Sequence, residues 1–380
     1  MADFKDEISP AMAARLASEL ERAWPAFPTG SFLAGLDAQL APRALLARVD
    51  VVADRLAASL PTDFAEAASV MWRALESESL TGWMTLPCGY WVARAGADEP
   101  ALALALLAGL TPRWSSEGPI RVFIERHPEI TYEHLRRWAT DPDEHVRRLV
   151  SEGTRPRLPW APQLRGVRAD PGPNLGLLDR LVDDPSAYVR RSVANHLNDI
   201  SKDHPDLALE LAGRWLGRGP GAAWAVRHGL RSMVKAGDRR ALALMGVSVD
   251  ADIALVWLEA PSEVVVGQAV TFTFTLVVEG GAPADAVIDY RVHYAGASGA
   301  RRPKVFKLTR RRLVPGQPET IVRRHRFEHV SVRRIWPGPH RIDVQVNGRV
   351  LGAVDIEVVD GTSPGGPRPS PRPSPGAGPG

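Results

Sequence analysis

The sequence has little cysteine and no long apolar run. One cysteine among 380 residues, Cys88, excludes an internal disulfide and a four-thiolate metal site, and it suits a reducing cytoplasm. The longest apolar run, 101–110, is about half as long as a membrane span requires, so we expect no membrane contact. The first residues also lack the basic and apolar segments of a secretory signal. With 44% apolar and 24% charged residues, the chain has the composition of a soluble, folded, multidomain protein.

Motifs of several enzyme classes are absent as well. No CxxC or HExxH occurs and the histidines have no metal-ligand spacing, so we expect no metal. No GxxxxGK[ST], GxGxxG or GxSxG motif supports nucleotide-dependent or serine-hydrolase chemistry. Nothing near Cys88 in the sequence indicates a thiol nucleophile. We therefore expect no cofactor, and any catalysis to depend on side chains alone.

The charge is unevenly distributed along the chain. The net charge is only +3, but residues 301–349 hold fourteen Lys and Arg against three acids, whereas residues 1–100 hold eight against fourteen. Such a basic segment indicates a polyanionic partner. A solvated basic surface is the alternative.

The middle of the chain contains an internal repeat. Asp141-Pro142 precedes Val146-Arg147-Arg148, and the same pattern returns 43 residues later as Asp184-Pro185 and Val189-Arg190-Arg191. A period near 40 is typical of stacked helix pairs of the HEAT type. We expect each proline at the first helical position, each valine in the core and both arginines on the concave face.

Beyond residue 250 the apolar period changes to two. Apolar and polar residues alternate over 270–278 and 288–294, and Asn347-Gly348 separates two further alternating runs, which predicts a hairpin. Several short strands of this kind predict an immunoglobulin-like β-sandwich. The predicted fold is thus multidomain: an all-α HEAT-like repeat solenoid over 1–248, an all-β sandwich over 249–360, and a disordered Pro/Gly/Arg-rich tail over 361–380.

Three carboxylates stand beside arginine or lysine in successive helical units. They are Glu117, Glu152 and Asp199, and the repeat geometry can bring them onto one concave surface. The alternative is that they cap helices or form ordinary ion pairs with their basic neighbours.

Two segments carry a resemblance to a known family. Residues 146–160 (VRRLVSEGTRPRLPW) and 184–215 closely resemble the AlkC branch of the AlkC/AlkD superfamily of DNA alkylation repair glycosylases, and 224–245 continue the likeness. The resemblance extends over 1–245 and is most specific from 110 to 245. Some AlkC-type members carry a C-terminal immunoglobulin-like domain, which agrees with the predicted sandwich, whereas the tail lies outside the family pattern.

The resemblance implies a monofunctional hydrolase that acts on alkylated double-stranded DNA. Its substrates would be cationic methylated bases, chiefly 3-methyladenine with 3-methylcytosine as a second candidate, reached without a deep base-flipping pocket. It also implies a cytoplasmic protein that associates with the nucleoid when bound to DNA. We expect a monomer without an obligate protein partner.

The resemblance also suggests roles for individual residues. Glu117, Glu152 and Asp199 match acidic positions that can stabilise a sugar cation or position the attacking water. Trp160 and Trp114 would present π faces to the lesion, although a core role is the alternative for Trp114. Contacts to DNA phosphates are expected from Arg148, Arg155, Arg190, Arg191 and Lys202, and from part of the basic segment 301–334.

Fold alone favours a different function. HEAT arrays usually bind other macromolecules, so a non-catalytic module for nucleic acid or protein remains an alternative. Hydrolysis of RNA or nucleotides has less support, because the sequence offers no obvious ligands for a phosphate-activating metal.

Overall fold

The computed structural model describes residues 4–296, 301–330 and 333–361. The chain divides into two compact units, of which the first ends at Ser232 and the second begins at Met233. The last helices before the first strand therefore belong with the strands, and the domain boundary at 248 stays a prediction. Apart from Gly361, the predicted tail lies outside the described residues.

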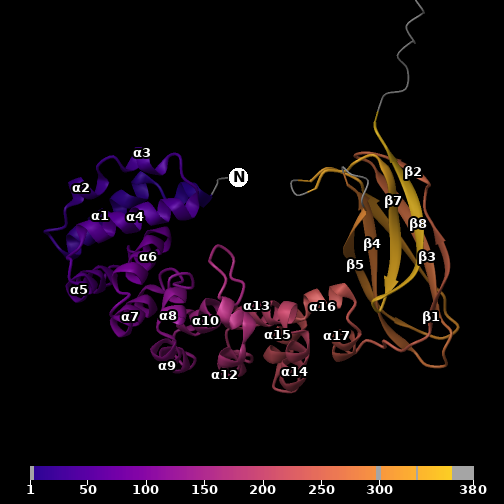
Figure 1. The fold of residues 1–380 in the computed structure, drawn as a ribbon. Helices are drawn as coiled ribbons and strands as arrows, with labels where there is room; N and C mark the ends of the chain where they lie inside the picture. Colours follow the sequence, from indigo (N-terminus) through magenta and orange to yellow (C-terminus); the bar gives the residue numbers. More distant parts are fainter. Residues whose placement is uncertain (1–3, 297–300, 331–332, 362–380) are drawn as a thin grey trace, which may run out of the picture. The chain divides into compact units, whose positions relative to one another are not determined.

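The first unit is helical, and Figure 1 shows its helices following one another in chain order. This arrangement confirms the predicted helical repeat fold. Within its described residues the chain has the 3-10 helices η1 (Phe4–Glu7) and η2 (Gly82–Met84). Its α-helices are α1 (Pro10–Ala23), α2 (Thr29–Leu33), α3 (Leu36–Leu40), α4 (Leu45–Ser59), α5 (Phe64–Leu75), α6 (Thr85–Ala95), α7 (Pro100–Leu110), α8 (Ile120–Arg126), α9 (Pro128–Trp138), α10 (Glu144–Gly153), α11 (Arg165–Ala169), α12 (Gly172–Leu181), α13 (Ala187–Asp203), α14 (Pro205–Trp215), α15 (Pro220–Gly229), α16 (Arg231–Ala236) and α17 (Arg239–Leu244).

The repeated Asp-Pro pairs form turns rather than the first helical residues. Asp141 Oδ1 accepts a hydrogen bond from the Asp143 amide, and Asp184 Oδ1 accepts one from the Ser186 amide, each at 2.8 Å. Asp143 and Ser186 then cap α10 and α13. The expected place of the prolines is therefore wrong, because a carboxylate that bonds two residues ahead makes a turn before the cap.

The first arginine of each repeated pair folds back onto its own turn. Nη1 of Arg147 donates to the carbonyl oxygens of Asp141 and Pro142, and Nη1 of Arg190 bonds the corresponding carbonyls of the next turn. Arg147 also holds the carboxylate of Asp184 with Nε and Nη2, at 2.7 and 3.0 Å. The contact between Arg147 and Asp184 joins consecutive repeats. Arg147 and Arg190 thus bond turns and do not take the concave position expected of both arginines in each pair.

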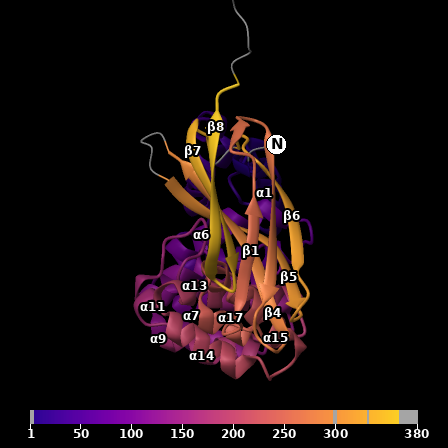
Figure 2. The ribbon, with the colours of Figure 1, turned by 90° about the vertical axis from the view of Figure 1, so that its right-hand side faces the viewer.

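The described residues of the second unit form two sheets (Figure 2). One has the strand order β1-β3-β6 and the other β2-β8-β7-β4-β5. All strand pairs are antiparallel except β2 with β8. The strands are β1 (Ile253–Glu259), β2 (Glu263–Val265), β3 (Ala269–Val278), β4 (Ala284–Ala295), β5 (Arg301–Leu313), β6 (Glu319–Arg326), β7 (Gly338–Val346) and β8 (Arg349–Val359).

The sandwich core follows the alternation seen in the sequence. Phe272, Phe274 and Leu276 of β3 are fully buried, and so are Ile288 and Val292 of β4 in the other sheet. Residues of one parity enter the space between the sheets because side chains alternate across a strand. The immunoglobulin-like architecture is thereby confirmed.

A histidine links the two sheets inside this core. The ring nitrogens of His325 on β6 lie 3.1 Å from the hydroxyl of Tyr290 and 2.9 Å from that of Tyr294, both on β4. Burial, reinforced by the charge of Arg333, lowers the pKa of His325 to about 4. The imidazole is therefore neutral at neutral pH and can donate to one tyrosine while it accepts from the other.

The predicted hairpin turn joins β7 and β8. Asn347 and Gly348 both have a positive φ, 47° and 80°, as a two-residue turn of this type requires. Gly348 also packs against the backbone of Gly237, since a Cβ at position 348 would lie 2.3 Å from the Gly237 carbonyl oxygen. Only glycine fits both conditions.

Replacement of Gly348 by alanine should therefore destabilise the second unit more than the same replacement of a glycine that has a positive φ but no close contact. We expect Gly348→Ala to lower the free energy of unfolding by about 2–4 kcal/mol, and the control Gly316→Ala by about 1 kcal/mol. Gly316 has a similar φ of 74°, but a Cβ added there would meet no atom within 4 Å. Urea titration followed by circular dichroism measures both, and equal losses would contradict a role for the Gly237 contact.

The buried His325 makes stability depend on pH. Its pKa is about 4 in the folded chain, below the ordinary value of 6.5, so unfolded chains take up the proton first as the pH falls. Stability should therefore decrease from pH 6.5 towards 4, with a loss of about 2 kcal/mol from this group at pH 5. Urea titrations at pH 7 and 5 measure the loss. His325→Gln should show a smaller loss between these pH values; an equal loss would contradict the assignment.

Candidate active site

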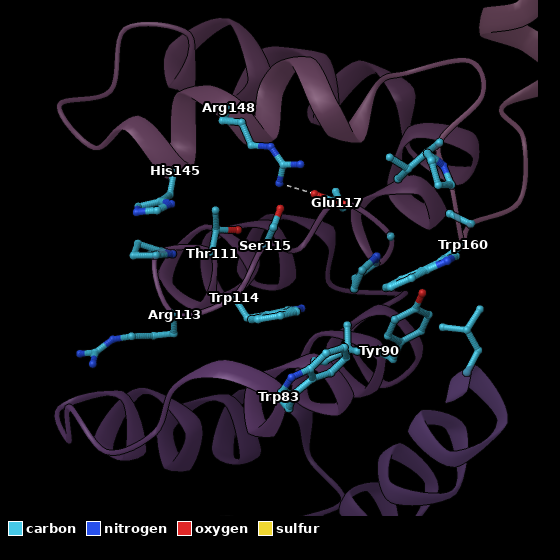
Figure 3. Close-up of a pocket in the computed structure, with 18 of the residues that line it drawn as sticks. Trp83, Tyr90, Thr111, Arg113, Trp114, Ser115, Glu117, His145, Arg148 and Trp160 are labelled. Atoms are coloured by element: carbon cyan, nitrogen blue, oxygen red, sulfur yellow. Dashed lines mark hydrogen bonds and ion pairs between the residues drawn. The ribbon is translucent and has the colours of Figure 1, made fainter. Parts of the chain in front are cut away.

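A hollow of about 370 Å³ opens in the helical unit beside Glu117 (Figure 3). Its walls come from α4, η2, α6, the segment between α7 and α8, α10, the segment before α11, and α13. The rings of Trp83 and Trp114 lie 4.7 Å apart in one wall. Aromatic side chains contribute much of the lining, namely Trp83, Tyr90, Trp114, Trp160 and Tyr188.

Glu117 and Arg148 form an ion pair at this hollow. Nη1 of Arg148, on α10, donates to Oε2 of Glu117, and the two side chains point towards each other in Figure 3. Nη2 of the same arginine lies 3.4 Å from Oε1 of Glu152. The guanidinium also lies 5.0 Å from the centre of the Tyr188 ring. Arg148 thus connects the carboxylate that lines the hollow with a more deeply buried one.

Arg155 bridges the other two carboxylates. Its Nη1 lies 2.7 Å from Oε1 of Glu152 on α10, and its Nε lies 2.9 Å from Oδ2 of Asp199 on α13. Glu152 is 5% exposed and Asp199 only 1%. Burial alone would lower the pKa of Arg155, but the two carboxylates outweigh it and raise that pKa. The arginine therefore stays charged and holds two acidic groups in the interior.

The remaining carboxylate oxygens have different partners. The Ser192 hydroxyl donates to Oε2 of Glu152 at 2.6 Å, so both oxygens of this residue are held by buried groups. Oδ1 of Asp199 instead accepts from the ammonium of Lys202 at 3.0 Å. The Lys202 side chain is 43% exposed. Asp199 is thus held by one buried cation and one surface cation.

His196 is a neighbour of the site that sequence reasoning missed. Its Nδ1 lies 3.0 Å from the Ser151 carbonyl oxygen, which can only accept, so Nδ1 carries the proton. Burial lowers the pKa of His196 to about 4, and the ring is neutral at neutral pH. Ser192, His196 and Asp199 are spaced by four and three residues on α13. This helical spacing is the signal that could have identified His196.

The two predicted tryptophans both line the hollow. Trp114 is about one-third exposed, which favours a surface role over the core alternative. Trp160 is 59% exposed, and its φ of 62° lies in the left-handed region that a bulky residue rarely adopts. Its ring meets Phe4 edge-on at 5.7 Å. The unusual backbone turns Trp160 into the hollow, as Figure 3 shows.

The predicted phosphate contacts fall into two groups. Arg191 and Lys202 are at the surface, and Arg148 is partly accessible. Arg155 is buried between carboxylates, and Arg190 bonds the carbonyls of its turn. These contacts argue against phosphate binding by Arg155 and Arg190. The roles of Arg148, Arg191 and Lys202 stay predictions.

Three further expectations concern the cysteine, metal sites and membrane-spanning helices. Burial raises the pKa of Cys88 to about 12, so its thiolate is not available as a nucleophile at neutral pH. Among the described side chains, no group of three or more His, Cys, Asp or Glu has the arrangement to hold a metal ion. Within the same ranges, no helix is both long and apolar enough to cross a membrane.

The basic segment of the sequence forms two edge strands of the sandwich. β5 ends the five-stranded sheet and β6 ends the three-stranded one. An ion pair between Arg311 and Glu319, 3.4 Å long, connects them. We call the exposed basic residues of these two strands the basic edge: Lys304, Lys307, Arg310, Arg311, Arg312, Arg323, Arg324 and Arg326.

Known proteins are similar to this chain in sequence, and one of them also in fold. A family model described as the C-terminal Ig-like domain of uncharacterised protein YhaZ matches residues 257–360. YhaZ of Bacillus subtilis (strain 168) is 32% identical over 361 residues, which cover 94% of this chain and 100% of YhaZ. Pseudomonas fluorescens alkylpurine DNA glycosylase AlkC, solved bound to DNA containing an abasic site analog, matches with a TM-score of 0.88 and 36% identity over 94% of this chain and 100% of that chain. The chain therefore belongs to the family that includes AlkC and YhaZ.

Proposed function

We propose that this protein is a DNA glycosylase that removes cationic alkylated bases from double-stranded DNA. The observation that carries the proposal is the group of three carboxylates, Glu117, Glu152 and Asp199, gathered beside an aromatic hollow in a chain that matches AlkC over 94% of its length. The proposed substrates are 3-methyladenine and, as a second candidate, 3-methylcytosine. The products are the free base and an abasic site, without strand cleavage.

The chemistry requires little acid catalysis. When the bond between C1′ and the glycosidic nitrogen breaks, its electron pair leaves with the base and neutralises the positive charge of the base. Positive charge then develops on the deoxyribose, where a nearby carboxylate stabilises it. A water oxygen bonds to C1′, and its proton passes to a carboxylate. Asp199, Glu152 and Glu117 are the groups proposed for these two tasks.

The aromatic hollow suits a cationic base. The faces of Trp114 and Trp160 carry negative charge density, which attracts a cation by about 0.5–2 kcal/mol per ring. Trp160 is more than half exposed, as expected for a lesion that is recognised near the surface rather than in a deep pocket. Glu117 lies in the same hollow, where it is paired with Arg148.

Binding to the duplex would involve both units. Lys202 offers a cation beside Asp199, Arg191 is an exposed cation of the same helix, and the basic edge offers a second row. Neutralisation of several phosphates would make affinity fall steeply with salt. Charged edge strands also prevent sheet-to-sheet aggregation, which is the structural alternative for the basic edge. We expect a monomer that works on the nucleoid in the cytoplasm without an obligate protein partner.

Release of free methylated bases from methylated duplex DNA, resolved by chromatography, tests the proposal. We expect wild-type protein to release 3-methyladenine, and Asp199→Asn to lower the single-turnover rate by about 10²–10³-fold while duplex binding persists. Glu152→Gln should also lower the rate.

The matched control is Asp203→Asn. Asp203 is an ion-paired aspartate on the same helix, held by Arg157 and Arg168, and it should not be needed for excision. Retained excision by both site variants would contradict the roles of Asp199 and Glu152. Absence of release by wild type, with salt-sensitive duplex binding intact, would favour the non-catalytic binding module.

A further inference from the structure

We propose that Lys202 is a removable counter-ion of Asp199. In the DNA-free protein its ammonium neutralises this carboxylate, and when the substrate binds, the ammonium moves to a phosphate of the DNA. The inference rests on the proposed glycosylase function. It identifies a positioning residue that makes the carboxylate available only when DNA is present.

The reason to expect such an exchange is electrostatic. Each of the three site carboxylates has a cationic partner: Glu117 has Arg148, Glu152 has Arg155 and, at 3.4 Å, Arg148, and Asp199 has both Arg155 and Lys202. A carboxylate neutralised by close cations has little field left to stabilise positive charge on a sugar. Some of these pairs must therefore open before the site can favour a cationic transition state.

Arg155 is not the partner that leaves. It is 10% exposed and contacts carboxylates on two helices, so its departure would take the buried cation from two buried charges at once. Its Nε and Nη1 are directed to different residues, which fixes the geometry of both. Arg155 therefore stays and keeps Oδ2 of Asp199 in place.

Lys202 has the properties of a partner that can leave. It lies one turn after Asp199 on α13, and 43% of its side chain is exposed. A lysine ammonium is a compact charge with three donors on a flexible stem, so it can exchange a carboxylate for a phosphate at little geometric cost. A DNA phosphate would offer it an equivalent anionic partner outside the site.

The exchange would free one particular oxygen of Asp199, Oδ1. Once Lys202 leaves, Oδ1 of Asp199 can accept a hydrogen bond from water, while Oδ2 remains bonded to Arg155. Both oxygens of Glu152 are held by the buried groups Arg155 and Ser192. Of these two buried carboxylates, Asp199 is therefore the one whose Oδ1 can receive the proton of the attacking water, and Glu152 acts mainly through its charge and through Arg155.

Two binding measurements on the full chain, neither of which needs catalysis, test this exchange with Lys202→Gln. The first is duplex affinity as a function of salt, in which loss of one phosphate contact should make the negative slope of log affinity against log salt shallower by about 0.9. The second is the affinity of the DNA-free protein for a free pyrrolidine iminosugar, a small cation that resembles the charged sugar. This affinity should increase about threefold or more, because the carboxylate has lost its counter-ion.

Three further variants make the result specific. Lys202→Arg keeps the charge and should restore both values towards wild type. Arg168→Gln removes a surface cation that is 45% exposed and pairs with Asp203 on the same helix, and it should leave iminosugar affinity at the wild-type value. In an Asp199→Asn background, Lys202→Gln should no longer strengthen iminosugar binding.

The proposal and the glycosylase function can fail separately. An unchanged salt slope, an iminosugar affinity that is unchanged or weaker in Lys202→Gln, or no measurable iminosugar binding by that variant would each overturn the counter-ion exchange. Excision of 3-methyladenine by wild-type protein would still stand in those cases. Conversely, the two binding results can be obtained even if no base is released.

Discussion

The buried bridge from Glu152 through Arg155 to Asp199 is the interaction on which the rest of the site depends. It places one guanidinium between carboxylates of α10 and α13, where burial removes most of the screening of the three charges by water. Loss of one member of such a group typically costs about 3–5 kcal/mol, because the others are left buried and unpaired. The bridge joins α10 to α13 and holds Oδ2 of Asp199 in place, so that Oδ1 is left to Lys202.

The fold could be predicted from sequence because its signals are local. The change of apolar period near residue 250 and the Asn347-Gly348 turn each depend on a few adjacent residues, and the strands and hairpin lie where these signals indicate. The repeat likewise indicated stacked helices. The predicted place of the prolines at the first helical position is wrong, because the Asp141 and Asp184 carboxylates form turns that end before the helix begins.

The site could be predicted only in part. Its carboxylates are easy to select, since acids beside arginines recur in successive repeats. The partner of each acid is not, because the decisive contacts join residues far apart: Arg155 reaches across 44 positions to Asp199, and Arg148 across 31 to Glu117. Adjacent arginines in one motif also point in different directions. Arg147 bonds a turn while Arg148 reaches the hollow, a difference set by helical phase and by the neighbouring repeat.

The contact of Arg147 with Asp184 affects how the helical unit unfolds in part. Each bond of this kind couples one repeat to the next, and in a solenoid the stability of the array depends on such nearest-neighbour terms. Because α10 carries Glu152 and the turn at Asp184 leads into α13, the coupled pair of repeats is the one that carries the bridge. These two repeats should thus open as a single cooperative segment, so partial unfolding would remove the site as a whole and leave no half-assembled charge cluster exposed to solvent.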